Sequence, residues 1–534
     1  MARHDILIRN GKVIDGTGKP PLGAEVAIRG DRIVDVGPNL GEADHVIDAK
    51  GKVVAPGFID PHAHLELLLL LQPDSSEYVA QGITTAVNGN CGHSVTPYES
   101  KRVLEYHYRN GLISIDFRNK AGGRSWKDLS GYIQAVKDNG GTAINHATLL
   151  GHGTLRWSVM GGALDRPPTE EENKELERLV AEGMEQGAVG MSTGLAYIPS
   201  RYATTEEIVD LTRTVAKYNG VYASHIRYYL GIEEATREAI EIGRRSGARV
   251  QVSHLHMGEV GAYKAIDEAR AAGQPVLADT IPQSTGHLVR GDRLIQFIMT
   301  MTPELFDVGV EGVLEAIKTL EGRKRIAQVE PFFSHDPNDV YIVNTGDEKV
   351  EARTVADVAA EKGLTPQDLM FDLLLERETG VTFWFGRNRK DTGTDFPPAE
   401  VIQYPWMGPG SDILMVEQSD PTGWYELMRP GCIVHFFRQA RARGVSVEEI
   451  IRRMTSMPAE HFRLQDRGVL KKGAFADVVV FDPDELYYPS RDEVDYRTSR
   501  HLVKGMDRVI VNGVIVLEND VQNDRRPGRM LRRG

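Results

Sequence analysis

The chain has 534 residues, of which 41% are apolar and 26% are charged, with a formal net charge of −13 at pH 7. This length exceeds one compact core and predicts two or three domains, while the balanced composition is typical of a globular enzyme. The acidic charge argues against a nucleic-acid partner, and no apolar run is long enough to span a membrane. Two cysteines and the lack of a signal-peptide pattern predict a cytoplasmic location without disulfides.

Short strands that alternate polar and apolar residues are predicted at both ends of the chain. Residues 1–55 contain three such segments, and the same pattern returns at 476–482 and 507–520. We therefore expect one small antiparallel β-sandwich formed by residues 1–55 and 466–534, which makes it a discontinuous domain. The basic tail, RRPGRMLRRG, is short and is interpreted as a solvated terminus.

The middle of the chain, residues 56–465, alternates short apolar strands with amphipathic helices, which predicts a TIM-like (β/α)8 barrel of mixed α/β class. Eight candidate strands occur in chain order: VVAPGFID, ITTAVNGN, TAINHATLL, AVGMSTGL, GVYASHI, RVQVSHL, QPVLADT and MGPGSD. Between the seventh and the eighth, residues from about 284 to 350 contain helical segments but no barrel strand. We interpret this stretch as an insertion that forms a lid.

Side chains that bind metals cluster at the predicted strand ends, where barrel enzymes carry their chemistry. They are His62, His64, Cys91, His225, His254 and Asp412. Residues i and i+2 of a strand point to the same side, so His62 and His64 can bind one cation. Imidazole together with thiolate favours Zn²⁺ over magnesium or calcium. Asp279 ends the seventh strand, with no role assigned to it.

Cys91 lies in a tight turn, GNCG, where a thiol can be inert packing, a nucleophile or a metal ligand. The histidines at the neighbouring strand ends favour metal ligation, either to one ion or as a bridge between two. Asp412 would complete the site as a ligand or take a proton from metal-bound water. His93 is a candidate for supporting the metal ligands, and Cys432 is expected to be a small buried hydrophobe.

At these residues the sequence resembles the metal-dependent amidohydrolase superfamily and, within it, the D-aminoacylase (N-acyl-D-amino-acid deacylase) group. The motifs that carry the resemblance are APGFIDPHAHLE, GNCGHS, GHGTLR, STGLAY, SHIR, SHLH and GSD, and it covers nearly the whole chain. It implies a deacylase-like hydrolase of a non-peptide C–N bond with one or two Zn²⁺ per chain. It further implies a small-molecule amide-type substrate. The charge and composition predict no nucleic-acid or membrane partner, and the oligomeric state stays open, with a homo-oligomer as one alternative.

The resemblance also implies a role for each metal-binding residue. The tightly bound zinc would be held by Cys91, His225 and His254. His62 and His64 would form a weaker site with help from Cys91 and Asp412. A metal-bound hydroxide would attack the amide carbonyl, with Asp412 as general base toward water and then as acid toward the leaving nitrogen. The roles of His152 and Arg156 in GHGTLR are open between contacting substrate and orienting the barrel mouth.

The D-aminoacylase group binds its substrate carboxylate through a lysine, tyrosines and an arginine, and this chain departs from that pattern. It has His256 in place of the lysine, Ile281 in place of a tyrosine, and Ile413 after the catalytic aspartate, while Tyr197 is retained. A charge-assisted contact to a carboxylate contributes about 1.5–3 kcal/mol, so losing several such contacts would weaken binding strongly. We therefore expect a substrate other than a simple N-acyl-D-amino acid.

Other functions are left open by the sequence. One is a true N-acyl-D-amino-acid deacylase in which other side chains bind the carboxylate. The candidates for substrate binding are Tyr197, His256, His287 and Arg290. A second is a cyclic-amide hydrolase or deaminase of the same superfamily, and a third is a cysteine hydrolase that uses Cys91 as its nucleophile. A non-catalytic scaffold is disfavoured, because all six expected ligand positions are occupied.

Overall fold

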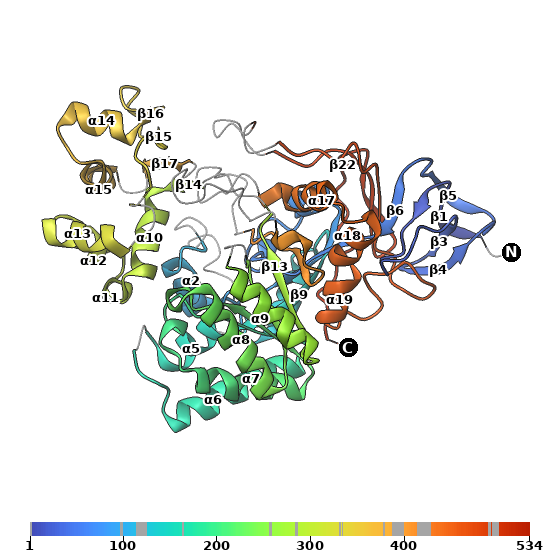
Figure 1. Ribbon diagram of the computed structural model, residues 1–534, viewed down its shortest axis with the longest axis horizontal. Coiled ribbons are helices and arrows are strands. Elements are labelled where there is room, and N and C mark those ends of the chain that lie inside the picture. Colours follow the sequence, from blue (N-terminus) through green and yellow to red (C-terminus); the bar gives the residue numbers. More distant parts are fainter. Residues whose placement is uncertain are drawn as a thin grey trace.

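The computed structural model of the chain describes residues 3–96, 100–113, 125–162, 165–255, 259–282, 287–329, 333, 335–377, 380–386, 400–413, 429–489, 493 and 501–533. Figure 1 shows an elongated molecule with the barrel in its centre. The strands from the two chain ends lie on one side of the barrel, and the segment inserted between its last two strands lies on the other.

An eight-stranded parallel sheet forms the barrel, and its strand order follows the order along the chain. The eight predicted barrel strands are therefore confirmed. The strands are β7 (Phe58–Asp60), β8 (Ile83–Asn88), β9 (Asn145–Gly151), β10 (Gly190–Gly194), β11 (Val221–His225), β12 (Arg249–Val252), β13 (Val276–Thr280) and β18 (Met407–Pro409). A bridge between Ala63 and Ile413, and a 2.9 Å hydrogen bond from Asp412 N–H to His62 O, connect the two edges beyond the ends of β7 and β18.

The first predicted strand is divided between two sheets at Gly57. Residues Val53–Pro56 form β6, which pairs with strands from the chain ends, and only β7 belongs to the barrel. A Cβ atom at Gly57 would lie 2.1 Å from Thr84 Oγ1, so a glycine is needed where the chain passes this close to β8. The division was not predicted because the apolar run continues without interruption through both strands.

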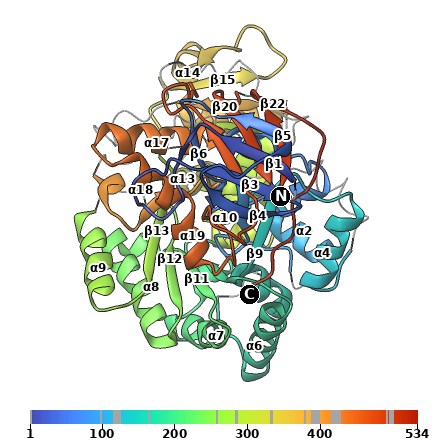
Figure 2. The ribbon, with the colours of Figure 1, turned by 90° about the vertical axis from the view of Figure 1, so that its right-hand side faces the viewer.

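Amphipathic helices cover the outside of the barrel (Figure 2). For α7, the Thr204 hydroxyl accepts the Glu207 N–H at 3.1 Å, which is the N-cap that the T-x-x-E pattern provides. The helices outside the insertion are α1 (Ser76–Ala80), α2 (Ser100–Arg109), α4 (Leu129–Asp138), α5 (His152–Met160), α6 (Glu170–Glu185), α7 (Thr205–Lys217), α8 (Ile232–Ser246), α9 (Val260–Ala271), α17 (Cys432–Ala442), α18 (Val447–Met454) and α19 (Ser456–His461).

Strands from both chain ends form two further sheets, with the orders β4-β3-β1-β5 and β2-β6-β19-β20-β21-β22. They are β1 (His4–Arg9), β2 (Lys12–Val13), β3 (Glu25–Arg29), β4 (Arg32–Gly37), β5 (Ala43–Asp48), β6, β19 (Val478–Phe481), β20 (Met506–Val511), β21 (Val514–Glu518) and β22 (Val521–Gln522). Ile28, Val54 and Ile510 belong to one apolar cluster between the sheets. The pairs β1–β5 and β2–β6 are parallel, so the prediction of antiparallel pairing is wrong for them. The alternation of residues shows which face of a strand is buried but not the direction of the neighbouring strand.

The basic C-terminal tail pairs with the amino end of barrel strand β9. Gly528 N–H donates to Thr142 O at 2.8 Å, and the backbone of His146 bonds to Arg529 O at 2.8 Å and to Leu531 N–H at 2.7 Å. The expectation of a solvated terminus is therefore wrong for this part of the tail. The pairing uses backbone atoms, which the charged side chains of the tail do not reveal.

The segment inserted between β13 and β18 is longer than expected and contains a sheet as well as helices. It continues past residue 350 to Phe385, and its strand order is β14-β17-β15-β16. The described elements are β14 (His287–Arg290), α10 (Gly291–Met301), α11 (Pro303–Phe306), α12 (Gly309–Ile317), α13 (Leu320–Val329), β15 (Val340–Asn344), β16 (Arg353–Thr354), α14 (Val355–Lys362), α15 (Pro366–Arg377) and β17 (Thr382–Phe385). Its apolar cluster also includes Tyr106 and Trp157 from the barrel helices, so the insertion packs against the barrel.

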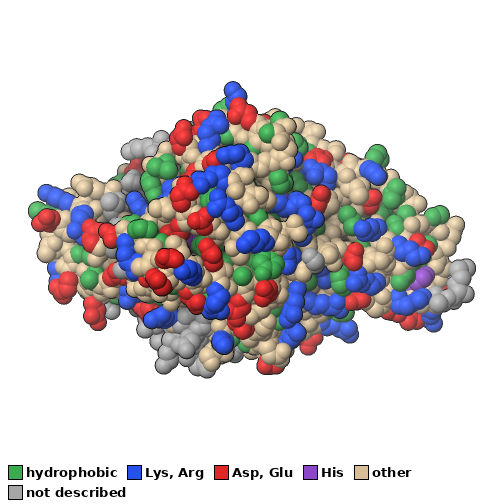
Figure 3. Space-filling model, turned by 90° about the horizontal axis from the view of Figure 1, so that it is seen from below, with side chains coloured by type: hydrophobic (Ala, Val, Ile, Leu, Met, Phe, Trp, Pro, Cys, Tyr) green, Lys and Arg blue, Asp and Glu red, His purple; other side chains and the backbone are tan. Residues whose placement is uncertain are grey.

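Positive and negative side chains are mixed over the face shown in Figure 3. Within the described residues, no helix is long and apolar enough to cross a membrane.

Candidate metal centre and active site

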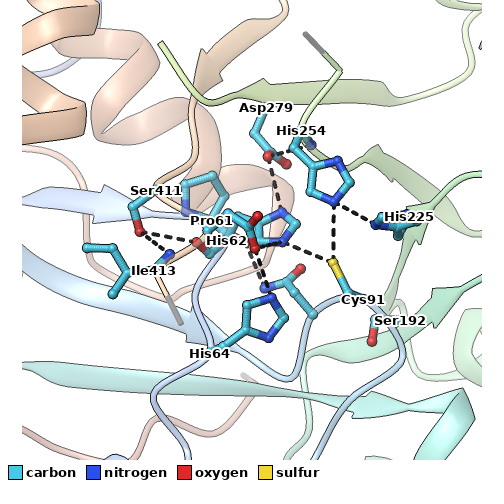
Figure 4. Close-up of polar contacts among 12 residues, drawn as sticks. Pro61, His62, His64, Cys91, Ser192, His225, His254, Asp279, Ser411 and Ile413 are labelled. Atoms are coloured by element: carbon cyan, nitrogen blue, oxygen red, sulfur yellow. Dashed lines mark hydrogen bonds and ion pairs between the residues drawn. The ribbon is translucent and has the colours of Figure 1, made fainter. Parts of the chain in front are cut away.

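The six candidate metal ligands predicted from the sequence lie together in the structure. Figure 4 shows the four histidines and Cys91 converging. They form two groups that share Cys91, and within each group the atoms able to bind a metal lie within 4.8 Å of one another. The first group contains His62, His64, Cys91 and Asp412, and the second contains Cys91, His225 and His254. All are buried except Asp412, which is partly exposed.

The Cys91 thiol lies between histidines of the two groups. Its Sγ is 3.3 Å from His62 Nε2 and 3.4 Å from His254 Nε2. The same His254 Nε2 atom also lies 2.8 Å from His225 Nδ1. These nitrogen and sulfur atoms converge on one small volume, as the ligands of a metal ion must.

Asp412 completes the other group. Its Oδ1 is 3.0 Å from His64 Nε2 and 3.3 Å from His62 Nε2, so one carboxylate oxygen faces both imidazoles of the H-x-H motif. The side chain of Asp412 is 14% exposed and borders a cavity, which places it between the buried histidines and whatever enters the cavity.

Three of the candidate ligands adopt a left-handed backbone conformation that is uncommon for residues other than glycine. The φ angles are 53° at Cys91, 34° at His254 and 48° at Asp412. Each such residue costs about 1–3 kcal/mol and persists only where surrounding contacts enforce it. Here the contacts include the Asp412 N–H bond to His62 O and the His254 N–H bond to Asp279 Oδ1, at 2.9 and 2.8 Å.

The turn that carries Cys91 depends on its glycines and on a serine from β10. A Cβ at Gly92, whose φ is 77°, would lie 2.7 Å from Gly194 N. The Ser192 hydroxyl accepts the Gly92 N–H at 3.0 Å and donates to Gly89 O, so it ties the two ends of the turn together. The motif STG in β10 thus positions the cysteine, a function that the sequence alone did not indicate.

Asp279 orients ligands of both groups. Its Oδ1 lies 3.1 Å from His62 Nδ1 and accepts the His254 N–H, while its Oδ2 accepts a hydrogen bond from Gln251 Nε2 at 2.7 Å. With Nδ1–H of His62 donating to the carboxylate, Nε2 of the same ring keeps its lone pair for a metal. The sequence shows that Asp279 lies at a strand end. Its hydrogen-bond partners come from other strands and are brought to it only when the barrel closes.

Two tyrosines contact the histidines of the second group. Tyr228 Oη is 2.7 Å from His254 Nδ1, and Tyr197 Oη is 3.2 Å from His225 Nδ1. Tyr228 follows β11 in a 3-10 turn (Tyr228–Leu230) and was not singled out from the sequence. No motif marks it, because its contact arises from the neighbouring strand β12.

The protonation of the cluster is governed by burial. Burial raises the pKa of the Cys91 thiol to about 11, even though the neighbouring His62 lowers it. Burial, together with His254, holds the pKa of His225 well below its usual value. Burial also lowers the pKa of His62, but the charges of Asp279 and Cys91 outweigh this and raise it well above its usual value.

A divalent cation at this cluster would favour the thiolate and the neutral imidazoles, which are the forms that bind metals. The donor set of one thiolate, four imidazoles and one carboxylate fits Zn²⁺ by both ligand type and number.

A cavity of about 120 Å³ opens beside the cluster. His64, Cys91, His254 and Asp412 line its inner end. The remaining lining residues are His93, Asn110, Gly111, Leu112, Tyr197, Phe297 and Thr300. Among these lining residues, which belong to the described part of the chain, there is no lysine or arginine.

The insertion helix α10 forms one wall of this cavity together with the loop after α2. Phe297 and Thr300 come from α10, and Arg293 Nη1 of the same helix donates to Gly111 O at 3.0 Å. Arg109 Nη1 at the end of α2 donates to Phe306 O of α11 at 2.6 Å. The insertion thus borders the cavity, as a lid would, and is bonded to the barrel beside it.

The four predicted substrate residues have different positions. Tyr197 lines the cavity. Arg290 does not line it, because its guanidinium group forms two 2.8 Å hydrogen bonds to the Asp292 carboxylate at the start of α10. His287 begins β14, but its side chain is outside the described part of the structure, and His256 lies outside the described residues.

His152 and Arg156 do not line the cavity. Both are fully buried and bind the same carboxylate oxygen, Glu207 Oε1, at 3.0 and 3.1 Å, while His152 Nδ1 also bonds to Ser200 at 2.9 Å. They therefore position the segment after β10, which answers the question that the sequence left open. Cys432 is buried and forms no disulfide, as predicted.

A parallel barrel with histidines, a cysteine and an aspartate at its strand ends is the architecture of metal-dependent hydrolases. Residues 45–285 and 426–517 match the model of the Amidohydrolase family, and the chain belongs to this family. It is 30% identical to the D-aminoacylase of Alcaligenes xylosoxydans xylosoxydans over 542 residues, which cover 99% of this chain and 98% of that relative.

Solved structures agree with this assignment. N-acyl-D-glutamate deacylase from Bordetella bronchiseptica, complexed with zinc and a phosphonate inhibitor, has a TM-score of 0.74 and 29% identity, covering 99% of this chain and 100% of that one. A D-aminoacylase described by its binuclear metal centre has a TM-score of 0.72 and 28% identity, with the same coverage. The protein is therefore an amidohydrolase that acts on carbon–nitrogen bonds other than peptide bonds, and its relatives are metal-dependent.

Proposed function

We propose that the protein is a zinc-dependent hydrolase of an amide bond in a small molecule that lacks the carboxylate of simple N-acyl-D-amino acids. The observation that carries the proposal is the pair of donor groups joined by Cys91 at the inner end of the cavity.

The residues present divide between two ions. Cys91, His225 and His254 would hold the more tightly bound ion, because all three are buried, whereas the other group includes the partly exposed Asp412. The group that contains Asp412 and the two histidines of the H-x-H motif would hold the weaker one. When bound, Zn²⁺ polarises a carbonyl group and lowers the pKa of water toward neutrality.

Asp412 is the residue placed to move protons. Its carboxylate borders the cavity, and its Oδ1 is held by His62 and His64 at 3.3 and 3.0 Å. It accepts a proton from the attacking water and returns it to the leaving nitrogen, so one group serves as base and then as acid. Tyr197 and His93 line the same cavity.

The composition of the cavity supports the choice of substrate. A buried carboxylate needs a cationic or multiple hydrogen-bonding partner, because leaving a charge unpaired costs several kcal/mol. The described lining residues include no lysine or arginine, the side chain of Ile281 is apolar and buried, and Arg290 is paired with Asp292.

Hydrolysis of a substrate panel by the zinc-loaded protein tests this function. The panel contains N-acetylmethionine, N-acetylmethioninamide and a cyclic amide, each assayed for the released amine and for ammonia. We expect the carboxylate-free N-acetyl amide to be hydrolysed at least about tenfold faster than N-acetylmethionine, since burying an unpaired carboxylate costs several kcal/mol and about 1.4 kcal/mol corresponds to tenfold. Faster turnover of N-acetylmethionine would instead favour a true N-acyl-amino-acid deacylase, and ring opening would favour a cyclic-amide hydrolase.

A further inference from the structure

His93 is a buried imidazole on the cavity wall whose ring nitrogens find no hydrogen-bond partner among the described residues. The residue is 4% exposed, and its Nδ1 is fully enclosed without a partner. Its neighbour His107 has one bonded ring nitrogen, because Nε2 bonds to Ser94 O at 3.0 Å while Nδ1 is unpaired, and both nitrogens of His152 are bonded.

The position of the His93 ring is well defined although its polar atoms are unpaired. Its backbone N–H donates to Asn90 O at 2.9 Å, within the turn that carries Cys91. The ring stacks on Tyr197, with centroids 5.9 Å apart and planes 28° apart, and contacts Tyr106 at 5.4 Å between centroids. Leaving a polar group of a buried ring unpaired costs about 1–3 kcal/mol. Because Nδ1 is enclosed, Nε2 is the ring nitrogen that a ligand in the cavity can reach.

The neighbours of His93 indicate which part of a substrate it meets. Its ring lies 6.2 Å from that of His64, whose Nε2 is 3.0 Å from Asp412 Oδ1. Because Asp412 returns its proton to the leaving nitrogen, the substituent on that nitrogen lies on this side of the cavity. The described lining has no lysine or arginine there that could bind an anion.

We propose that His93 is a specificity-determining residue that hydrogen-bonds an uncharged polar group, such as a carboxamide, on the amine side of the scissile bond. This inference rests on the proposed amide hydrolysis and names the substrate class for it: N-acylated amines that carry a neutral polar group next to the nitrogen. A site built to hydrogen-bond such a group discriminates strongly against analogues that lack it, because its own polar atoms are then left unpaired.

Three substrates of similar size separate this function from simple packing. They are racemic N-acetylmethioninamide, N-acetylmethionine and N-acetyl-3-(methylthio)propylamine, which has no polar group at this position. In zinc-loaded full-length protein, His93→Phe should lower kcat/KM for the carboxamide by about 10–100-fold, the size of one lost hydrogen bond to a buried partner. The same variant should change kcat/KM for the propylamine substrate by less than about twofold, and His93→Gln should restore part of the loss.

Two controls accompany the comparison. The zinc content of His93→Phe should equal that of the parent protein, and His435→Phe, at a buried histidine of α17 that does not line the cavity, should leave the ratio between substrates unchanged. An equal loss for all three substrates in His93→Phe would show that the ring serves packing alone and would overturn the inference.

Binding measurements keep the inference separate from the proposed hydrolysis. Calorimetric titration of zinc-loaded Asp412→Asn with N-acetylmethioninamide and with the propylamine analogue measures affinity without requiring turnover. We expect the carboxamide to bind more tightly, and the His93→Phe substitution in this background to remove that preference. Lack of turnover by the parent protein argues against the hydrolytic function, whereas a preference that is absent, or is unchanged by His93→Phe, refutes the role of His93.

Discussion

Replacing Asp279 with asparagine changes one buried carboxylate oxygen into an NH₂ group, and we expect this to weaken zinc binding by about 10–100-fold. Three donors surround the carboxylate: His62 Nδ1–H, the backbone N–H of His254 and Gln251 Nε2. An asparagine has a single acceptor oxygen, so at least one of these donors must face another donor. Because the site is fully buried, water does not replace the lost partner.

The size of the effect follows from those contacts. An unpaired buried donor costs about 1–3 kcal/mol, which corresponds to about 5- to 150-fold in a binding constant. If the NH₂ group turns toward His62, that ring loses the partner that fixes its Nε2 for the metal. If it turns toward Gln251, either two NH₂ groups meet behind the candidate ligand histidines or Gln251 must turn over its own amide, which moves its Nε2 out of place. Either orientation disturbs a contact that supports the candidate metal ligands.

A second substitution supplies a matched rescue. Gln251→Glu alone places two carboxylates in contact, so we expect it to be less stable than the parent protein. Combined with Asp279→Asn, it provides an acceptor for the new NH₂ group and leaves the remaining amide oxygen for His62 and His254. The double variant should therefore recover most of the lost zinc affinity.

Competition with a chelator of known affinity measures the zinc dissociation constants, and thermal unfolding of the metal-free proteins shows whether each variant folds. Unchanged zinc affinity in Asp279→Asn would refute the reasoning. So would an equally weak double variant, because the loss would then not come from the mismatched donors.

Three further predictions concern other parts of the molecule. Cys91→Ala removes the ligand common to both groups and should lose zinc by elemental analysis, whereas full zinc content would favour the nucleophile interpretation. Burial lowers the pKa of His435 to about 3, so below about pH 6.5 the unfolded chain binds one proton more than the folded chain. The free energy of unfolding therefore falls as the pH drops through that value. In His435→Phe, the fall between pH 7.5 and pH 5, measured by urea unfolding, should be smaller by about 2 kcal/mol. Deleting residues 527–534 removes three backbone hydrogen bonds to the segment around β9 and should lower the free energy of unfolding by about 2–4 kcal/mol, and an unchanged urea midpoint would show that the tail adds no stability.

The barrel could be predicted because short, mostly apolar strands that lead into polar side chains recur between amphipathic helices. That pattern involves residues close together in the chain, so it can be recognised from the sequence alone. The same logic placed His62, Cys91 and Asp412 at one edge, and the structure brings them together.

The contacts that support the site were not predictable in the same way. Asp279, Ser192 and Tyr228 act on residues of neighbouring strands, and their hydrogen bonds exist only once the barrel has closed. Nothing in the spacing of these residues distinguishes them from other buried polar groups.

The inserted sheet was missed for a different reason. Its strands are two to five residues long, and β17 reads TFWF, a run without alternation. Segments this short carry too little periodicity to separate a strand from a loop or a buried helical turn. The parallel pairing of β1 and β5 could not be predicted either, since parallel and antiparallel pairing bury the same side chains.

The six-stranded sheet has a consequence for how the protein is made. Val54 of β6 pairs with Val480 of β19, so neighbouring strands come from opposite ends of the chain. On the ribosome, β2 and β6 are completed early, but the edge of β6 that pairs with β19 stays open until almost the entire chain has emerged. The β6–β19 pairing joins strands far apart in sequence and is therefore slow to form. A circular permutant that joins the two ends would make the same contacts local, and its sheet would assemble early in refolding.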